Sequence, residues 1–133
     1  RPNPAIEWLI RLNAASSAHF PADAACATAA GPDGVVIPKV EDPAMLREVD
    51  ARLGAAERDA GRPAGSLRVF AMIESARAVL IAPAIAAATP RLQGLILGHV
   101  DLLRDLGLTP GDHFFHGRGK RIGDLVGQGL EDG

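Results

Sequence analysis

The chain has 133 residues, of which 47% are apolar, 23% charged and 4% aromatic, so it is long enough for one globular domain and too short for two sizeable ones. Its 14 basic and 16 acidic residues give a formal charge of −2 without a clustered basic stripe, which argues against a nucleic acid or an anionic membrane as partner. No apolar run is long enough to span a bilayer and no signal peptide is recognisable, so we expect a cytoplasmic protein.

Two residues bear on the compartment and on the completeness of the chain. Cys26 is the single cysteine, so it forms no internal disulfide, and without metal-type cysteine spacing the chain suits a reducing cytosol. We expect Cys26 to be a buried, small apolar residue. Because the chain begins at Arg1 rather than Met, we also expect that a segment precedes it.

The first half of the chain predicts two strands, each followed by a helix. The apolar run Trp8–Leu12 predicts a strand, and the Ala-rich stretch near Asp23–Ala30 predicts a helix. After a Gly-Pro-Asp-Gly turn, Val35–Ile37 is apolar and β-branched throughout, as in a strand buried on both faces. Asp42 and Pro43 then supply an N-cap and a first-turn proline for a second helix with apolar residues at helical spacing.

The second half of the chain repeats this pattern. Leu67–Ile73 predicts a strand, and Ser75–Ala88 predicts a helix that Pro83 kinks or divides in two. Leu92–Leu97 predicts a fourth strand, and a short helix from Asp101 ends at a glycine. Strands that alternate with helices are joined as parallel strands by right-handed crossovers, so the predicted class is α/β.

The residues after Pro110 differ in composition from the rest. We place one domain at residues 1–110 and expect a loop-like or disordered tail, rich in Gly and charge, at 111–133. His113 and His116 have His-x-x-His spacing, but we discount them as a metal site because no helix or further ligand accompanies them. The Gly-Arg-Gly-Lys stretch at 117–120 lacks the spacing and the preceding strand of a phosphate-binding loop.

Polar residues follow each predicted strand. Arg11 and Asn13 end the first strand, Lys39 follows the second, Glu74 the third and Asp101 the fourth. Ligands of α/β folds bind at the carboxyl ends of the strands, so we expect these residues to converge at one rim. Two carboxylates without a Cys or His partner favour Mg²⁺ or Mn²⁺, with Glu74 and Asp101 as the ligands. Arg11 offers a fork for a substrate carboxylate, and Lys39 a second positive charge.

Structural explanations compete with these roles. Asp101 is also placed to cap a helix, Glu74 to be a first-turn acid, and Arg11 or Lys39 to be a solvated strand end. Ser75 is predicted to cap a helix rather than to act as a nucleophile, because no His-Asp pair accompanies it. We favour the functional interpretation because the candidates fall at successive strand ends.

Four stretches taken together resemble one known family. They are IRLN at 10–13, GVVIPKVEDP at 34–43, FAMIESARAVLIAPAIAAATPRLQGLILG at 70–98 and DLLRDLG at 101–107. In this order they are similar to the citrate lyase β-subunit-like family of the HpcH/HpaI aldolase superfamily. The resemblance implies a TIM (β/α)₈ barrel, which needs roughly 250 residues. We therefore expect this chain to be a fragment, a partial barrel of about four parallel βα units.

The resemblance also implies a chemistry. It is that of a metal-dependent carbon–carbon lyase of the aldol or Claisen type, which cleaves a 3-hydroxyacyl-CoA such as citryl-, malyl- or citramalyl-CoA into an acyl-CoA and a keto acid. The implied metal ligands are Glu74 and Asp101, and the implied catalytic residues are Arg11 and Lys39. The implied substrate-binding residues are Arg11, Asn13, Gly98, His99, Val100 and Asp101. The general acid/base is not among them, and the full-length protein is expected to be a homo-oligomer.

Two alternatives remain open. One is a CoA-independent pyruvate aldolase of the same superfamily, and the other is an inactive, truncated barrel that serves as a binding or interaction module.

Four parallel strands leave two unpaired edges, and residues meant for the barrel interior lack an opposing layer. We assign to this interior Val36, Phe70, Ile73 and Leu97. The isolated chain is therefore expected to self-associate and to show no lyase turnover.

Overall fold

The computed structural model of the chain describes residues 6–108, so the predicted tail at 111–133, with His113 and His116, lies outside the described residues. One sheet of four parallel strands has the order β1-β2-β3-β4. The strands are β1 (Leu9–Arg11), β2 (Gly34–Ile37), β3 (Arg68–Ile73) and β4 (Leu92–Leu97). The helices are α1 (Phe20–Ala30), α2 (Pro43–Asp59), α3 (Ala76–Leu80), α4 (Ala82–Ala86) and α5 (His99–Asp105). The predicted α/β class is confirmed.

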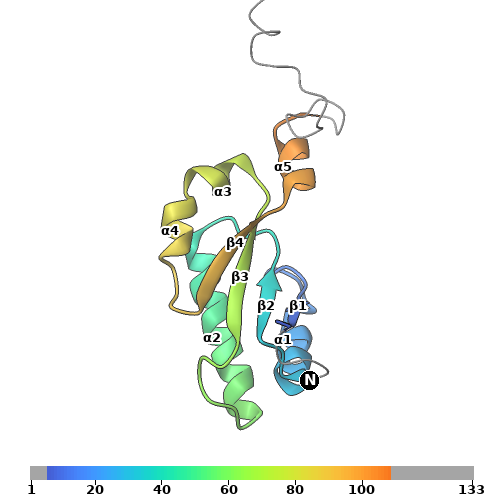
Figure 1. Cartoon of the computed structure of the whole chain (residues 1–133), viewed down its shortest axis with the longest axis vertical. Helices are drawn as coiled ribbons and strands as arrows, with labels where there is room; N and C mark the ends of the chain where they lie inside the picture. Colours follow the sequence, from blue (N-terminus) through green and yellow to red (C-terminus); the bar gives the residue numbers. More distant parts are fainter. Residues whose placement is uncertain (1–5, 109–133) are drawn as a thin grey trace, which may run out of the picture.

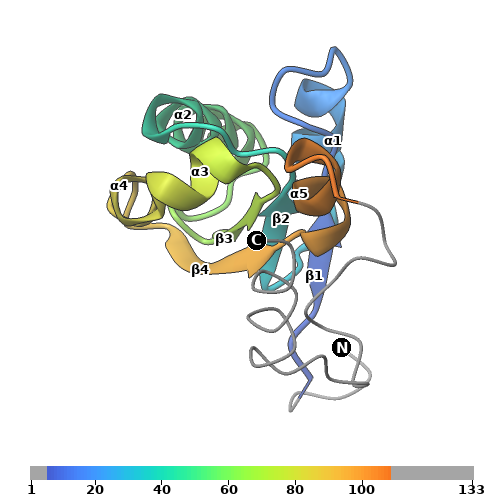
Figure 2. The ribbon, with the colours of Figure 1, turned by 90° about the horizontal axis from the view of Figure 1, so that it is seen from above.

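The first four helices and the last one occupy different places. Figures 1 and 2 show α1 to α4 along one side of the sheet, whereas α5 lies beyond the carboxyl ends of the strands. The core fills the space between the sheet and the helices. It includes alternate strand residues and the inner faces of α1 and α2, among them Val35, Ile37, Val69, Ala71, Ile73, Phe20, Ala24, Leu46, Val49 and Leu53.

Local sequence signals account for the helix ends. Asp42 accepts a hydrogen bond from the Met45 N–H at 2.9 Å and caps α2, as predicted. Ser75 caps α3 by accepting from the Ala78 N–H at 3.2 Å, and the predicted long helix is divided at Ile81, just before Pro83.

Helix α5 begins earlier than the sequence predicted. Its first residue is His99 and its N-cap is Gly98, so Asp101 lies in the first turn and does not cap the helix. The alternative explanation of Asp101 as an N-cap is therefore wrong. The reason is that the chain turns immediately after β4, where the Gly98 N–H still donates to the Ile73 carbonyl at 2.9 Å.

The face of the sheet opposite the helices carries a row of paired residues. Arg11 pairs with Val36, Val36 with Phe70, and Phe70 with Gly94, so all four lie on this open face. Gly94 makes room for the aromatic ring, because a Cβ there would come within 3.3 Å of the Phe70 ring. The assignment of Val36 and Phe70 to one inner face agrees with this row.

The assignment to the inner face of the barrel is wrong for Ile73 and Leu97. Ile73 is buried in the core under the helices, and Leu97, which pairs with it, shares that side and is 54% exposed. Side chains along a strand alternate with a period of two, so Phe70 and Ile73, three residues apart, point to opposite faces.

Cys26 is also placed differently from the prediction. The inner stripe of α1 consists of residues 20, 24, 27 and 28, and Cys26 lies outside it and is exposed. Our expectation that Cys26 is buried is therefore wrong, because its position on the helix, rather than its small apolar side chain, decides its burial. Within residues 6–108, no helix has the length and apolar character needed to cross a bilayer.

A buried ionic cluster joins α2 to the start of β4. Arg91 donates to both carboxylate oxygens of Glu57 at 2.8 Å each and also forms an ion pair with Asp50. Glu57 further accepts from the N–H groups of Gly65 and Leu67. Burial opposes ionisation of Glu57, but the hydrogen bonds from Arg91 and the backbone outweigh it and lower its pKa to about 2. The cluster lies at the amino ends of the strands, away from the candidate site.

Candidate functional site

The loops that follow the strands meet at one rim. Three backbone hydrogen bonds carry the ladder past the strand ends: Leu12 N–H to the Val36 carbonyl at 3.0 Å, Val40 N–H to that of Met72 at 3.2 Å, and Gly98 N–H to that of Ile73 at 2.9 Å. Each loop is therefore held against its neighbour. All the predicted site residues lie within three positions of a residue that takes part in one of these bonds.

Glu74 is the most buried charged residue of the rim. It is 7% exposed, and its Oε2 accepts a hydrogen bond from the backbone N–H of Lys39 at 2.7 Å. Its other side faces Gly98, where a Cβ would stand 2.4 Å from Glu74 Cγ and 2.8 Å from Oε1. Within the described residues no hydrogen bond or ion pair reaches Oε1. A nearly buried carboxylate therefore keeps one oxygen for a ligand that the described residues do not supply.

Lys39 has an unusual backbone. Its φ is 54°, and it is the one non-glycine residue with positive φ in the part of the chain that the structure describes. The left-handed conformation costs a residue with a Cβ about 1 kcal/mol or more, so surrounding contacts must stabilise it. The hydrogen bond from its N–H to Glu74 is such a contact. The Lys39 residue as a whole is exposed.

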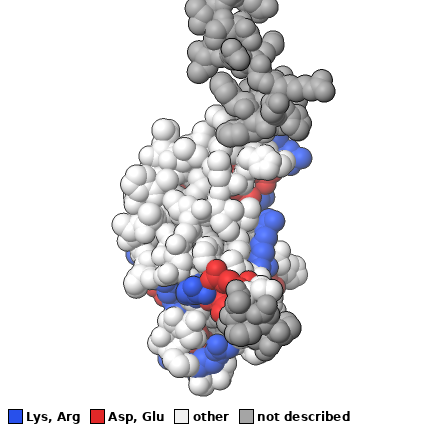
Figure 3. Space-filling model, viewed as in Figure 1, with Lys and Arg blue, Asp and Glu red and all other residues white. Residues whose placement is uncertain are grey.

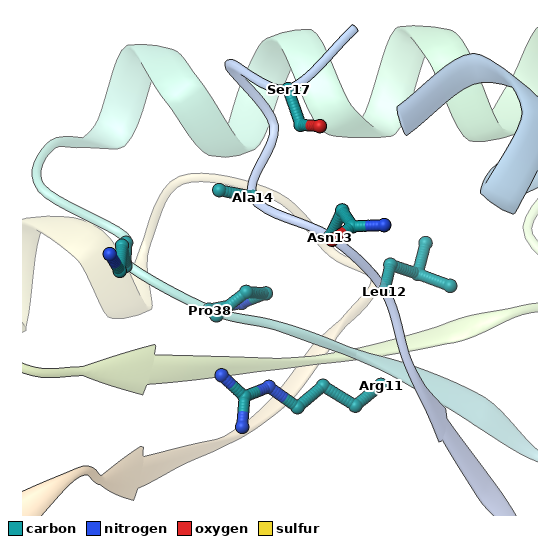
Figure 4. A pocket seen from close by; sticks show the side chains of 7 residues that line it. Arg11, Leu12, Asn13, Ala14, Ser17 and Pro38 are labelled. Atoms are coloured by element: carbon teal, nitrogen blue, oxygen red, sulfur yellow. The ribbon is translucent and has the colours of Figure 1, made fainter. Parts of the chain in front are cut away.

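A pocket of about 460 Å³ opens beside Lys39. It is lined by Arg11, Leu12, Asn13, Ala14, Ser17, Pro38 and Lys39. Figure 4 shows the Arg11 side chain extending from β1 past Pro38, below the loops that close the pocket. The lining includes two cationic side chains and no carboxylate, so the pocket suits a small anion.

Asn13 is tied to the following helix. Its backbone N–H and its side-chain amide both donate to Asp23 Oδ2, at 2.9 and 2.8 Å. These two hydrogen bonds lower the pKa of Asp23, which lies in the first turn of α1. Asn13 thus fixes the loop between β1 and α1, and its predicted contact with substrate stays a prediction.

Asp101 and Glu74 have different hydrogen-bond partners. The Asp101 carboxylate accepts from Arg104 at 3.1 Å, one turn along α5, and the Asp101 side chain is 41% exposed. His99 and Val100, also predicted to bind substrate, are exposed in the same turn. The described residues contain no group of three or more His, Cys, Asp or Glu side chains arranged to hold a metal. A metal at Glu74 and Asp101, with water or substrate as the other ligands, stays a prediction.

Sequence reasoning missed two residues of the rim. Ser17 lines the pocket opposite Arg11, and Glu41 accepts a hydrogen bond from the Ser75 hydroxyl at 2.8 Å. The bond between Glu41 and Ser75 joins residues 34 positions apart. No local spacing signals such a contact, and only the parallel packing of the loops after β2 and β3 creates it.

Comparisons with known proteins place this chain in a family. Residues 2–116 match the family described as HpcH/HpaI aldolase/citrate lyase. The citrate lyase subunit beta of Leuconostoc mesenteroides subsp. cremoris is 35% identical over 100 residues, which are 75% of this chain and 33% of the relative. The L-malyl-CoA/beta-methylmalyl-CoA lyase of Cereibacter sphaeroides is 40% identical over 76 residues, covering 57% of this chain and 24% of that enzyme.

A solved structure extends the similarity to three dimensions. The citrate lyase beta subunit of M. tuberculosis, complexed with oxaloacetate and magnesium, superposes with a TM-score of 0.56 at 29% identity, over 76% of this chain and 38% of that one. The four βα units correspond to part of its TIM-barrel-like fold. The chain spans about a third of the length of the curated relatives it matches. It belongs to the HpcH/HpaI aldolase/citrate lyase family.

Proposed function

We propose that the protein is a metal-dependent carbon–carbon lyase that cleaves a 3-hydroxyacyl-CoA, such as citryl-, malyl- or citramalyl-CoA, into an acyl-CoA and a keto acid. The observation that carries the proposal is the rim itself. Glu74 is a nearly buried carboxylate with one oxygen that has no partner within residues 6–108. Its other oxygen accepts a hydrogen bond from Lys39, which lines the same pocket as Arg11. The similarity to named citrate and malyl-CoA lyases supports this choice over a CoA-independent aldolase.

The donor chemistry of the rim fits Mg²⁺ or Mn²⁺. Glu74 offers Oε1, and Asp101, in the first turn of α5, offers a second carboxylate. Oxygen-only donors suit hard divalent cations, which keep several water or substrate ligands. When bound, such a cation stabilises negative charge that develops on the keto-acid oxygen. Glu74 and Asp101 are the proposed ligands.

The pocket residues supply binding and orientation. Arg11 pairs through its guanidinium fork with the carboxylate of the keto-acid part and favours the build-up of negative charge on the adjacent oxygen. Lys39 adds a second positive charge at the mouth of the same pocket. Asn13 and the turn from Gly98 through His99 and Val100 complete the proposed substrate contacts.

The bond changes are those of a retro-Claisen cleavage. A base takes the proton of the 3-hydroxyl, the bond between C2 and C3 breaks, and the hydroxyl carbon becomes the keto-acid carbonyl. The electron pair of the broken bond passes to C2 and the thioester, and C2 is then protonated to give the acyl-CoA. Arg11 holds the keto acid through these steps. We assign no base among residues 6–108.

The proposal is tested by substrate comparison. Malyl-CoA, citramalyl-CoA and citryl-CoA are supplied beside free hydroxy-keto acids to a complete homologous barrel with the same motifs, and the keto acid is trapped with phenylhydrazine. The expected result is Mg²⁺-dependent cleavage of the C2–C3 bond in one of the CoA thioesters. Cleavage of the free hydroxy-keto acids alone identifies a CoA-independent aldolase instead.

A further inference from the structure

The backbone N–H of Lys39, rather than its side chain, donates a hydrogen bond to the carboxylate proposed to bind metal. We propose that Lys39 is a positioning residue whose N–H, held in place by the left-handed conformation, fixes Glu74 so that Oε1 alone is presented to a cation. This inference rests on the proposed function, in which Glu74 is a metal ligand. In this inference Glu74 binds the cation through one oxygen only. The role of Lys39 depends on its backbone N–H and not on its ammonium group.

The geometry leaves the two Glu74 oxygens in different situations. Oε2 accepts the Lys39 N–H at 2.7 Å, a short distance for a hydrogen bond from a backbone amide. Oε1 lies on the side of Gly98, 2.8 Å from where a Cβ would stand, and has no partner within residues 6–108. Because Oε2 is committed to Lys39, a cation that approached both oxygens equally would have to displace that N–H.

The backbone of Lys39 is maintained at a cost. A lysine gains nothing locally from φ of 54°, since its Cβ disfavours the left-handed region. Next in the chain, Val40 donates its N–H to Met72 of β3, so the loop is pinned to β3 on the far side of Lys39. The left-handed residue turns the chain between Pro38 and Val40, and the N–H of Lys39 reaches Glu74 from within that turn.

Gly98 completes the cradle from the other side. A Cβ at this position would lie 2.4 Å from Glu74 Cγ, closer than real atoms approach, so any side chain would push the carboxylate away. The φ of Gly98 is −84°, which every residue tolerates, so the backbone alone does not demand glycine here. Glycine is required because the Glu74 side chain occupies the space that a Cβ would take. Lys39, after β2, and Gly98, after β4, thus flank the same carboxylate from either side of β3.

Variants of the full 133-residue chain separate the backbone role from the charge. Mn²⁺ binding is measured by electron paramagnetic resonance and calorimetry. Lys39→Ala keeps the N–H and removes the ammonium group, so its dissociation constant should stay within about twofold of the parent. Lys39→Pro removes the N–H and fixes φ near −65°, and it should weaken binding at least tenfold. Ala44→Pro, in the first turn of α2 where N–H groups lack intrahelical acceptors, is the matched control and should leave Mn²⁺ affinity unchanged.

A measurement on the unsubstituted chain keeps the test independent of folding. The Lys39 amide proton should shift on addition of Mg²⁺ and remain protected from exchange, whereas that of Val40, bonded to Met72, should not move. Loss of protection at Lys39 in saturating Mg²⁺ overturns the assignment of one-oxygen binding.

Further outcomes distinguish this inference from the proposed function on which it rests. Equal losses of affinity in Lys39→Ala and Lys39→Pro, or none in either, overturn the positioning role. Glu74→Gln should abolish Mn²⁺ binding, and full retention of binding there contradicts the proposed metal site itself. Gly98→Ala should weaken Mn²⁺ binding at least tenfold, while Gly94→Ala, which lies within β4 and meets Phe70 instead, serves as its control.

Discussion

Arg91 and Glu57 form a two-pronged ion pair in the interior, with both terminal guanidinium nitrogens 2.8 Å from the two carboxylate oxygens. The side chain of Glu57 is fully buried and that of Arg91 nearly so. The pair joins the last turns of α2 to the residue before β4, which are 34 positions apart in sequence. It therefore fixes the distance between the helix layer and the far strand of the sheet.

Removing one partner of this pair should destabilise the fold. Arg91→Leu leaves the Glu57 carboxylate buried without its counterion, a loss expected to cost about 3–5 kcal/mol. Urea unfolding followed by circular dichroism measures the free energy of unfolding. The control is Glu48→Gln, which breaks the exposed pair with Arg52 on the same helix and should cost about 0.5 kcal/mol or less. Equal losses in the two variants would contradict a special role for the buried pair.

The same pair makes stability depend on acid pH. The folded-state pKa of Glu57 is about 2, below its ordinary value of 4.5. A lowered carboxyl pKa stabilises the fold fully above pH 4.5, and this contribution is lost as the pH falls toward 2. The loss is roughly 3 kcal/mol for Glu57, and Asp50, whose pKa is also lowered, acts in the same direction. Urea midpoints between pH 7 and pH 2.5 should fall steeply below pH 4.5 and less so in Glu57→Gln.

The order of elements was predictable because each has a strong local signal. Val35 to Ile37 is a short β-branched run, and Asp42 with Pro43 marks the start of a helix whose apolar residues recur at the helical period. Such signals depend on near neighbours in sequence. They also placed Arg11, Lys39 and Glu74 at strand ends, since a strand end follows from the strand.

Features that depend on distant partners could not be predicted in the same way. The bond from Lys39 to Glu74 needs a left-handed residue, and Pro-Lys-Val carries no signal for one. Glu57 did leave a trace, because it continues the buried stripe of Leu46, Val49 and Leu53 on α2. A charge at an inner position of a helix indicates a buried counterion, but the sequence does not identify it as Arg91.

Asp101 offers a direct test of the proposed metal site. Asp101→Asn keeps the shape of the side chain and removes its charge, so Mg²⁺ binding should weaken about tenfold or more. Calorimetry with Mg²⁺ checks this in the complete homologous barrel. Arg104→Ala, which removes the partner of Asp101 in α5 and leaves the carboxylate, is the control and should not weaken binding. Unchanged affinity in Asp101→Asn counts against its role as a ligand.

Arg11 should not be replaceable by lysine. Lysine keeps the positive charge but lacks the planar fork that pairs with both oxygens of a carboxylate, so Arg11→Lys should lower turnover by tenfold or more. Steady-state rates in a complete homologous barrel test the prediction. Arg47→Lys, on the exposed side of α2, is the control. A rate within twofold of the parent for Arg11→Lys refutes the carboxylate-binding role.

The open face of the sheet makes the isolated chain prone to self-association. Within residues 6–108, β1 and β4 each pair with one neighbour only, and no described helix covers the face that carries Val36, Phe70 and Met72. Further apolar side chains are exposed on and beside the sheet, including Leu95 and Leu97, and Figure 3 shows few charges over α3, α4 and β4. Unpaired parallel edges next to apolar surface favour pairing with another chain.

We therefore expect the 133-residue chain to elute from size-exclusion chromatography as dimers or larger species. Its thermal unfolding should be broad, and an activity assay should detect no cleavage of the acyl-CoA substrates. Met72→Lys puts a charge on the open face, where Met72 pairs with Ile96, and should shift the chain toward the monomer. Ala51→Lys, at an exposed position of α2 in the helix layer, is the control and should leave the elution volume unchanged. A monomer that unfolds cooperatively and cleaves malyl-CoA with added Mg²⁺ would show that the four βα units are sufficient by themselves, and that the open face needs no partner.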